Sequence, residues 1–231
     1  MSAALEALLR HPGIWRGNEL SGVALSSIPS GFAELDCELP GGGWPRGALT
    51  EILYDREGIG EVSLLAPALT KLSREEAWVA FVDPPYLPYA PALAGSNIDL
   101  SKIVLVRTHS SNEGMWAMEQ ALRSGSCTAV LGFMPYCNER GLRRMQAAAE
   151  TGKCLAVYFA HSHHASRASP AALRVKLAPQ RQGTRGTLVQ IIKRRGGGWA
   201  PTLNLGLHHA LAVPQFPGTS AGNIPARLIF A

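Results

Sequence analysis

Mainly apolar runs alternate along this chain with segments in which apolar residues recur every three or four positions. The runs lie at 48–53, 78–82 (WVAFV, which is unbroken), 103–107, 128–132 and 154–160, and the periodic segments lie at 62–72, 112–124 and 139–151. Short unbroken apolar runs between polar turns are typical of strands buried on both faces of a parallel sheet, whereas a period near 3.6 is typical of helices. The pattern therefore predicts an α/β protein with a doubly wound, mostly parallel sheet.

The C-terminal part of the chain has a different periodicity. Apolar and polar residues alternate at 173–177, 188–193 and 202–207, which predicts an antiparallel β-meander beside the parallel sheet. The predicted core spans 30–211 and includes this meander at 173–207. Residues 1–29 are predicted to form a short helix and an irregular arm. Residues 212–231 are rich in Pro, Gly and Ser and end in an apolar tip, so we expect a flexible tail that is held by a partner or folded back on the core.

The turn between the run at 48–53 and the helix predicted at 62–72 has the layout of a phosphate-binding loop. A strand, a loop containing Asp55, Gly58 and Gly60, and a helix follow one another. In such loops backbone N–H groups hold the phosphates, and a Lys followed by Ser or Thr completes the site. Here Glu61 and Val62 stand in those two positions. Glu61 would repel a triphosphate and Val62 has no oxygen for magnesium, so the sequence predicts neither a nucleotide cofactor nor ATPase activity.

Several motifs, in order along the chain, resemble the RecA ATPase core. They are 30–36 (SGFAELD), 41–43 (GGG) and 45–52 (PRGALTEI). The run ending at Asp83 resembles the strand that carries the catalytic glutamate, but Pro85 stands at the glutamate position. The run at 127–133 resembles the Walker B strand, with Gly132 about where the aspartate would fall. RecA-like chains with this combined degeneration, and of this length, resemble the bacterial ImuA family.

The ImuA resemblance implies a non-catalytic RecA-like protein that accompanies an ImuB-type Y-family-like protein and an error-prone DnaE-type polymerase in SOS-induced translesion DNA synthesis. It leaves DNA, RecA and a second copy of the chain open as further partners. Residues 57–164 also resemble the cell-division inhibitor SulA, which implies action on FtsZ as the alternative function. The RecA-like lead-in before Glu57 and the basic meander after Leu173 favour the adaptor over the division inhibitor.

The chain carries a formal net charge of +5, and its cations are unevenly placed. From Leu173 to the C-terminus there are eight Lys or Arg residues and no Asp or Glu. This asymmetry predicts an acidic partner, either a nucleic acid or an acidic protein. The residues that we expect to contact DNA are Arg181, Arg185, Lys193, Arg194 and Arg195.

Three groups of side chains have two interpretations each. Tyr86 and Tyr89, in the proline-rich segment 83–91, are either base-stacking platforms or part of a rigid lid over the vacated nucleotide site. The methionines of the helix predicted at 112–124 form either an adaptable groove for a partner or ordinary core. His161, His163 and His164 are either metal ligands or hydrogen-bonding loop residues, and the absence of a nearby carboxylate in the sequence favours the second interpretation, without a metal.

The cysteines and the hydropathy bear on the compartment. Four widely spaced cysteines, without a CxxC or CxxH pair, predict buried free thiols in a reducing environment. The N-terminal sequence has no basic region followed by a long apolar stretch, and no apolar run approaches the length of a membrane span. We therefore expect a cytoplasmic protein.

Overall fold

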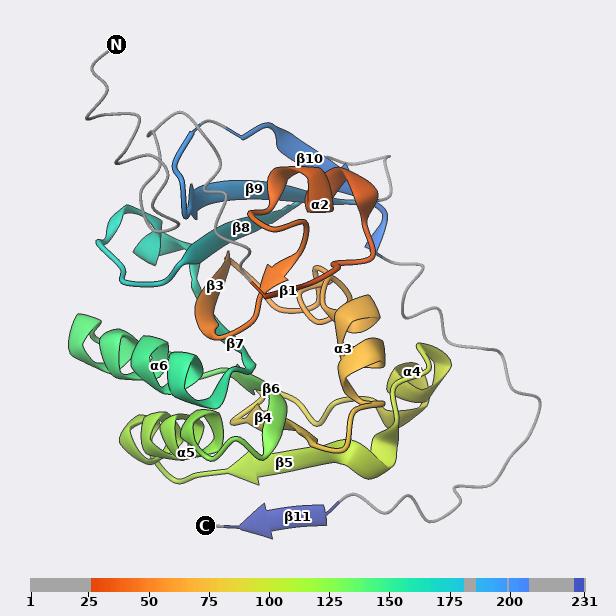
Figure 1. Cartoon of the computed structure of the whole chain (residues 1–231), viewed down its shortest axis with the longest axis vertical. Coiled ribbons are helices and arrows are strands. Elements are labelled where there is room, and N and C mark those ends of the chain that lie inside the picture. The colour runs from red at the N-terminus through yellow and green to blue at the C-terminus, as the bar shows by residue number, and fades with distance from the viewer. Residues whose placement is uncertain (1–25, 181–185, 199, 208–226, 231) are drawn as a thin grey trace, which may run out of the picture.

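The computed structural model describes residues 26–180, 186–198, 200–207 and 227–230. Within these ranges one nine-stranded sheet has the order β10-β9-β8-β3-β7-β6-β4-β5-β11 (Figure 1). Its strands are β3 (Ala48–Tyr54), β4 (Trp78–Val82), β5 (Ile103–Arg107), β6 (Cys127–Gly132), β7 (Leu155–His161), β8 (Leu173–Pro179), β9 (Thr187–Arg194), β10 (Thr202–Leu205) and β11 (Arg227–Phe230). In spatial order, the strands β8, β3, β7, β6, β4, β5 and β11 each run parallel to their neighbours in this series. The strands β8, β9 and β10 form an antiparallel meander. The predicted mixed α/β fold, with a mostly parallel sheet and antiparallel strands, is confirmed.

Helices cover both faces of this sheet. They are α2 (Ala33–Glu38), α3 (Ala66–Leu72), α4 (Ala90–Gly95), α5 (Ser111–Arg123) and α6 (Glu139–Gly152), with 3-10 turns η1 (Leu100–Lys102) and η2 (Ser162–Ser166). Leu49 and Leu53 of β3 belong to the same apolar cluster as the buried faces of α5 and α6, whereas Ile52 belongs to the cluster that contains α3. This division follows from the alternation of side chains along a strand. No helix in the described ranges is long and apolar enough to cross a membrane.

Helix α3 starts later than predicted, whereas the boundaries of α5 and α6 lie within one residue of the predicted ones. Helix α3 begins at Ala66 and not at Val62, with Pro67 in its first turn, where a missing N–H costs least. Residues 61–65 form turns instead. Helix α6 does not end at a left-handed glycine, because Lys153 has the positive φ of 50°. Gly152 is needed for packing, since a Cβ there would lie 1.8 Å from the carbonyl oxygen of Leu122.

The segments that flank the core are described only in part. Ser27 and Ile28, which we placed in the N-terminal arm, form β1 and pair with β2 (Trp44–Pro45). The approach is close, because a Cβ on Gly43 would lie 2.2 Å from the carbonyl oxygen of Ile28. The helix predicted near the N-terminus and most of the predicted tail lie outside the described residues. The end of the tail is folded back on the core, where β11 pairs with β5.

Candidate functional site

In the loop that follows β3, a side-chain carboxylate accepts hydrogen bonds from backbone N–H groups of the same loop. Gly58 and Gly60 have φ values of +77° and +99°, a region that L side chains rarely adopt. The N–H of Gly58 donates to Glu61 Oε1, and the N–H of Ile59 donates to Glu61 Oε2, each at 3.1 Å. Neighbouring backbone N–H groups of this kind are what a phosphate-binding loop offers to an anion. The Glu61 carboxylate thus stands in the place of a phosphate, which goes beyond the repulsion that the sequence predicted.

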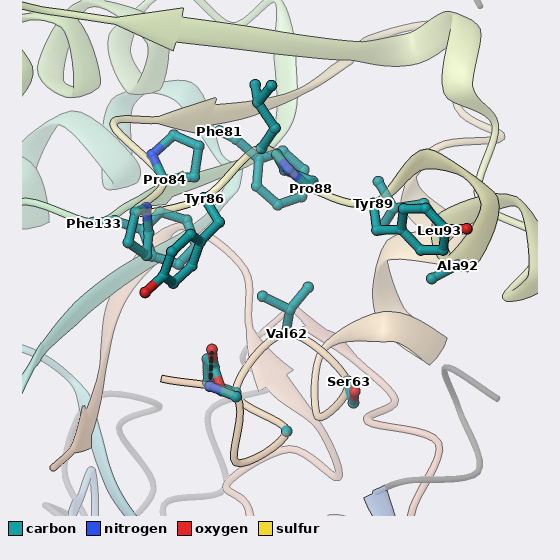
Figure 2. A pocket seen from close by; sticks show the side chains of 15 residues that line it. Val62, Ser63, Phe81, Pro84, Tyr86, Pro88, Tyr89, Ala92, Leu93 and Phe133 are labelled. Carbon is teal, nitrogen blue, oxygen red and sulfur yellow. Dashed lines mark hydrogen bonds between the residues drawn. The ribbon is translucent and has the colours of Figure 1, made fainter. Parts of the chain in front are cut away.

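The same loop is fixed by the antiparallel meander. The hydroxyl of Thr187 on β9 donates to the carbonyl oxygen of Ile59 at 2.6 Å. A Cβ on Gly60 would lie 3.0 Å from Cβ of Leu207, so the backbone passes close to the segment after β10. The loop therefore has a definite shape without a ligand. Val62 follows it and lies beside a cavity, where it offers an apolar surface and no oxygen (Figure 2).

The two other nucleotide-handling positions are committed to packing. A Cβ on Gly132 would lie 2.4 Å from Sδ of Met118, so an aspartate at the end of β6 would displace the Met118 side chain. Asp83 directly follows β4, and its carboxylate accepts hydrogen bonds from the N–H of Thr108 at 2.7 Å and from the Thr108 hydroxyl at 2.6 Å. Pro85, at the position of the expected glutamate, lines the cavity. The arrangement leaves no carboxylate at either expected position to orient a water or bind magnesium.

An apolar cavity of about 360 Å³ opens beside the loop, at the carboxyl ends of β4 and β6. Figure 2 shows Val62 across the cavity from Tyr86, with Tyr89 beside Leu93 of α4. Its lining residues include Gly60, Glu61, Phe81, Pro84, Pro85, Leu87, Pro88 and Ala92. The segment from Pro84 to Tyr89, which we call the proline lid, forms one wall of the cavity. Tyr86 and Tyr89 thus border the cavity, and the choice between base-stacking platforms and a rigid lid stays a prediction.

Aromatic rings form the floor of this cavity. Phe133 stacks on Phe159 with ring centroids 4.3 Å apart, and it lies 6.4 Å from Phe81 at an interplanar angle of 7°. Tyr54 approaches the edge of Phe159 at 6.1 Å. Burial, followed by the charges of Glu61 and Glu57, holds the pKa of Tyr54 far above its ordinary value. The hydroxyl of Tyr54 therefore stays protonated at neutral pH.

A second, more polar cavity of about 640 Å³ lies beside the first and includes His161 and His163. Their Nδ1 atoms are 2.8 Å apart, and the N–H of His163 also donates to His161 Nδ1. Partial burial, together with the neighbouring histidines and arginines, lowers the pKa of His164. The described part of the chain contains no group of three side chains placed to hold a metal ion. The carboxylate of Asp55 lies 3.9 Å from His161 Nδ1, so the expectation of no carboxylate near these histidines was wrong. The contacts between His161 and His163 are hydrogen bonds, and the choice between the two interpretations stays a prediction.

A buried ion pair that the sequence analysis missed anchors the loop after β7. Arg174 Nε donates to Glu51 Oε2 at 2.5 Å, and both side chains are less than one tenth exposed. The Arg174 guanidinium also binds the carbonyl oxygens of His164, Ala165 and Arg167. The hydroxyl of Ser169 donates to the second oxygen of Glu51 at 2.8 Å. The signal in the sequence was a charged residue inside each of two apolar strands.

The predicted DNA-contacting cations are not equivalent. Arg194 is largely buried, and its guanidinium binds the carboxylate of Glu38 at 2.9 Å, so its charge is already paired within the fold. Lys193 lies at the surface, and its ammonium group donates to the carbonyl oxygen of Ser169 at 2.6 Å. Arg195 is exposed. Arg181 and Arg185 lie outside the described residues, so the cluster as a whole stays a prediction.

Helices α5 and α6 present a further surface. Met118 is fully buried, as the core interpretation requires, but Met115 and the exposed Trp116 line a cavity between the two helices. Glu119 joins the helices by binding both Arg123 and Arg144. Among the cysteines, Cys37 is exposed, in contrast to the buried thiols that we expected. All four cysteines are free.

These features define a mixed α/β protein whose phosphate-type loop is closed by its own carboxylate and faces an apolar cavity. Residues 47–156 match the family model described as "Cell division inhibitor SulA". This segment runs from the start of β3 into β7, so it includes the loop, the proline lid and helices α3 to α6. The lead-in with α2 and the meander from β8 to β10 lie outside the match. The predicted resemblance to SulA is confirmed for this part of the chain.

The individual relatives are SulA and RecA proteins. SulA of Edwardsiella piscicida is 30% identical over 92 residues, which are 40% of this chain and 55% of that protein. Protein RecA of Brevibacillus brevis is 30% identical over 138 residues, which are 56% of this chain and 38% of that protein. The chain thus spans about half of the first relative and less than half of the second. The crystal structure of SulA from Pseudomonas aeruginosa aligns with a TM-score of 0.41 and 21% identity, covering 48% of this chain and 97% of that one.

Proposed function

We propose that this chain is a non-catalytic accessory protein of SOS-induced translesion DNA synthesis, an adaptor of the ImuA type. Its proposed partners are an ImuB-type Y-family-like protein and an error-prone DnaE-type polymerase, and its compartment is the cytoplasm. The proposal includes a degenerate, doubly wound RecA-like core. Helices on both faces of a mostly parallel sheet, and the RecA relatives that extend over 56% of the chain, support that part.

The observation that carries the proposal is the Glu61 carboxylate bound to the N–H groups of Gly58 and Ile59. An ATPase needs those donors for phosphate, together with a Lys and a magnesium ligand. In this chain those N–H donors are bonded to Glu61, and Val62 and Gly132 provide no oxygen ligand for magnesium. A RecA-like protein without nucleotide chemistry acts through its surfaces. We therefore assign it no enzymatic activity.

The proline lid is the surface that best fits a protein partner. Tyr86, Leu87 and Tyr89 are 72%, 65% and 59% exposed, and they project from one short segment. Clustered exposed apolar side chains mark interaction sites, and tyrosine is among the residues that dominate binding energy. The lid also borders the cavity, which offers a concave apolar site for an anchoring side chain. We expect the ImuB-type protein to bind here.

The test is the affinity of the intact chain for the ImuB-type protein of the same organism, measured by calorimetry and by co-purification from DNA-damaged cells. The double variant Tyr86→Ala, Tyr89→Ala should bind at least about tenfold more weakly, because two aromatic anchors each contribute on the order of 1 kcal/mol or more. Trp116→Ala is the matched control, since Trp116 is 56% exposed on α5, which packs on the other face of the sheet. No binding by the intact chain would refute the adaptor. Equal losses in both variants would refute only the lid as its contact.

A second candidate is a cell-division inhibitor that acts on FtsZ, which the match of 47–156 to the SulA family model supports. Here too the chain would act through protein surfaces and not through ATP. The two functions separate in one experiment. Production of the intact chain in undamaged cells, with FtsZ assembly followed in vitro by light scattering, should give normal division and unaltered assembly if the adaptor is correct. Filamentous cells and inhibited assembly would favour the second candidate.

A further inference from the structure

The outer edge of β5 is occupied by the C-terminal end of the same chain. β11 runs parallel to β5, with Arg227 opposite Val104 and Phe230 opposite Arg107 (Figure 1). The other side of β5 pairs with β4. The sequence of β5 is IVLVR, without a proline or an internal charge that would discourage pairing. An unprotected edge of this kind accepts additional strands, so β11 covers a surface that would otherwise be open to other chains.

The position of β11 is unusual for the last strand of a chain. β10 precedes it in sequence but lies at the opposite edge of the sheet. Nine strands about 4.8 Å apart place the two edges roughly 38 Å from each other. The 20 residue steps from Leu207 to Arg227 reach at most about 70 Å. Consecutive elements are usually neighbours, so this pairing depends on a long connection and not on local geometry.

We propose that the edge of β5 is a strand-binding site, and that its second occupant is residues 227–230 of another copy of this chain. Strand addition relies mainly on backbone hydrogen bonds, so the same segment from another copy makes the same set of bonds. A tethered segment competes at an effective concentration on the order of millimolar, so exchange between copies sets in as the protein approaches that range. Reciprocal exchange leaves no β5 edge bare and closes as a twofold dimer. This inference is independent of the function proposed above.

The first test asks whether the edge binds the segment in trans. A fluorescent peptide of residues 224–231 is titrated with the intact chain and with the full-length variant Leu228→Pro, Ile229→Pro, in which the tethered strand has lost two N–H groups. The peptide should bind the proline variant at least tenfold more tightly, and a peptide methylated at the amides of residues 228 and 229 should not bind. Ser220→Pro, in the connection, is the control and should behave as the unmodified chain. Equal binding to all chains, or binding of the methylated peptide, overturns the proposal.

The second test uses the register. Ile229 lies opposite Val106, so Val106→Cys and Ile229→Cys in a Cys37→Ser background should form a disulfide within one chain. When the two cysteines are placed on differently tagged copies, dimers should form in proportions that rise from micromolar toward millimolar protein. Val104→Cys with Ile229→Cys, two residues out of register, is the control and should cross-link at least tenfold less. Absence of the disulfide within one chain overturns the site, and absence of dimers at every concentration overturns the second occupant.

Discussion

Replacing Glu61 with Ala tests whether the loop after β3 is closed by its own carboxylate. The substitution removes both acceptors of the hydrogen bonds from Gly58 and Ile59, each 3.1 Å long. It leaves the glycines, whose positive φ values shape the loop, unchanged. Two backbone donors then point at solvent or at whatever anion the solution supplies.

The expected loss follows from these two bonds. A hydrogen bond to a charged group contributes about 1.5–3 kcal/mol when it is well shielded from water. Glu61 is half-buried, so water competes for both groups and about 1–2 kcal/mol in total is a realistic loss. For a chain of this size that corresponds to a melting temperature about 2–8 °C lower. Glu61→Gln keeps one acceptor oxygen and should lose about half as much.

The measurement is thermal unfolding by circular dichroism, with and without inorganic phosphate. Glu57→Ala is the matched control, because it removes an exposed carboxylate from the same loop and should change the stability by less than about 0.5 kcal/mol. Phosphate should stabilise Glu61→Ala more than the unmodified chain. A fluorescent ATP analogue should bind neither the unmodified chain nor the control.

Two results would refute this reasoning. If Glu61→Ala and Glu57→Ala have the same stability and the same response to phosphate, the carboxylate does not close the loop. If the unmodified chain binds the ATP analogue at micromolar affinity, and changes in the loop abolish that binding, the loop retains the function that we consider lost.

Three further predictions concern the core, the thiols and DNA. Arg174→Met should lower the free energy of unfolding in urea by about 3–5 kcal/mol, because it leaves a buried carboxylate unpaired; a loss below 1 kcal/mol would contradict this. At pH 8 a thiol reagent should modify Cys37 alone in the native protein. The free energy of unfolding should fall from about pH 9 toward pH 11, because burial raises the pKa of Cys127 to about 11 and the unfolded thiol releases its proton first. A free energy of unfolding that does not change over this pH range would be inconsistent with buried thiols. Arg195→Ala should weaken DNA binding and reduce the number of counterions released on binding by about one, as measured by fluorescence anisotropy at several salt concentrations. Arg194→Ala should instead destabilise the fold, as measured by thermal unfolding. Unchanged DNA affinity for Arg195→Ala would remove this residue from the interface.

The sequence by itself determined the class of the fold and the absence of a phosphate-binding Lys and hydroxyl after the glycine loop. The mainly apolar runs of β4 and β5 predicted both strands to the residue, because a strand covered on both faces has no polar side to interrupt it. Glu61 and Val62 ruled out the Lys and the hydroxyl of a phosphate-binding loop. These conclusions depend on residue type and near neighbours, which a sequence displays directly.

Only the tertiary structure decided how the charged groups are used. The pair of Arg174 with Glu51 joins residues 123 positions apart, and that of Arg194 with Glu38 joins residues 156 positions apart. Neither partner is visible from local spacing, so nothing in the sequence showed that Arg194 is paired with Glu38. The direction of the Glu61 side chain depended on the backbone angles of the glycines before it, which the sequence permits but does not specify.

The place of the C-terminal strand was also beyond the sequence. The apolar tip was recognised, but not the edge that it covers, because strand pairing joins backbone groups that every residue carries. A side-chain pattern can say that a segment is suited to extended structure. Which edge accepts it depends on which edge the folded sheet leaves open, and that is known only once β4 and β5 have come together.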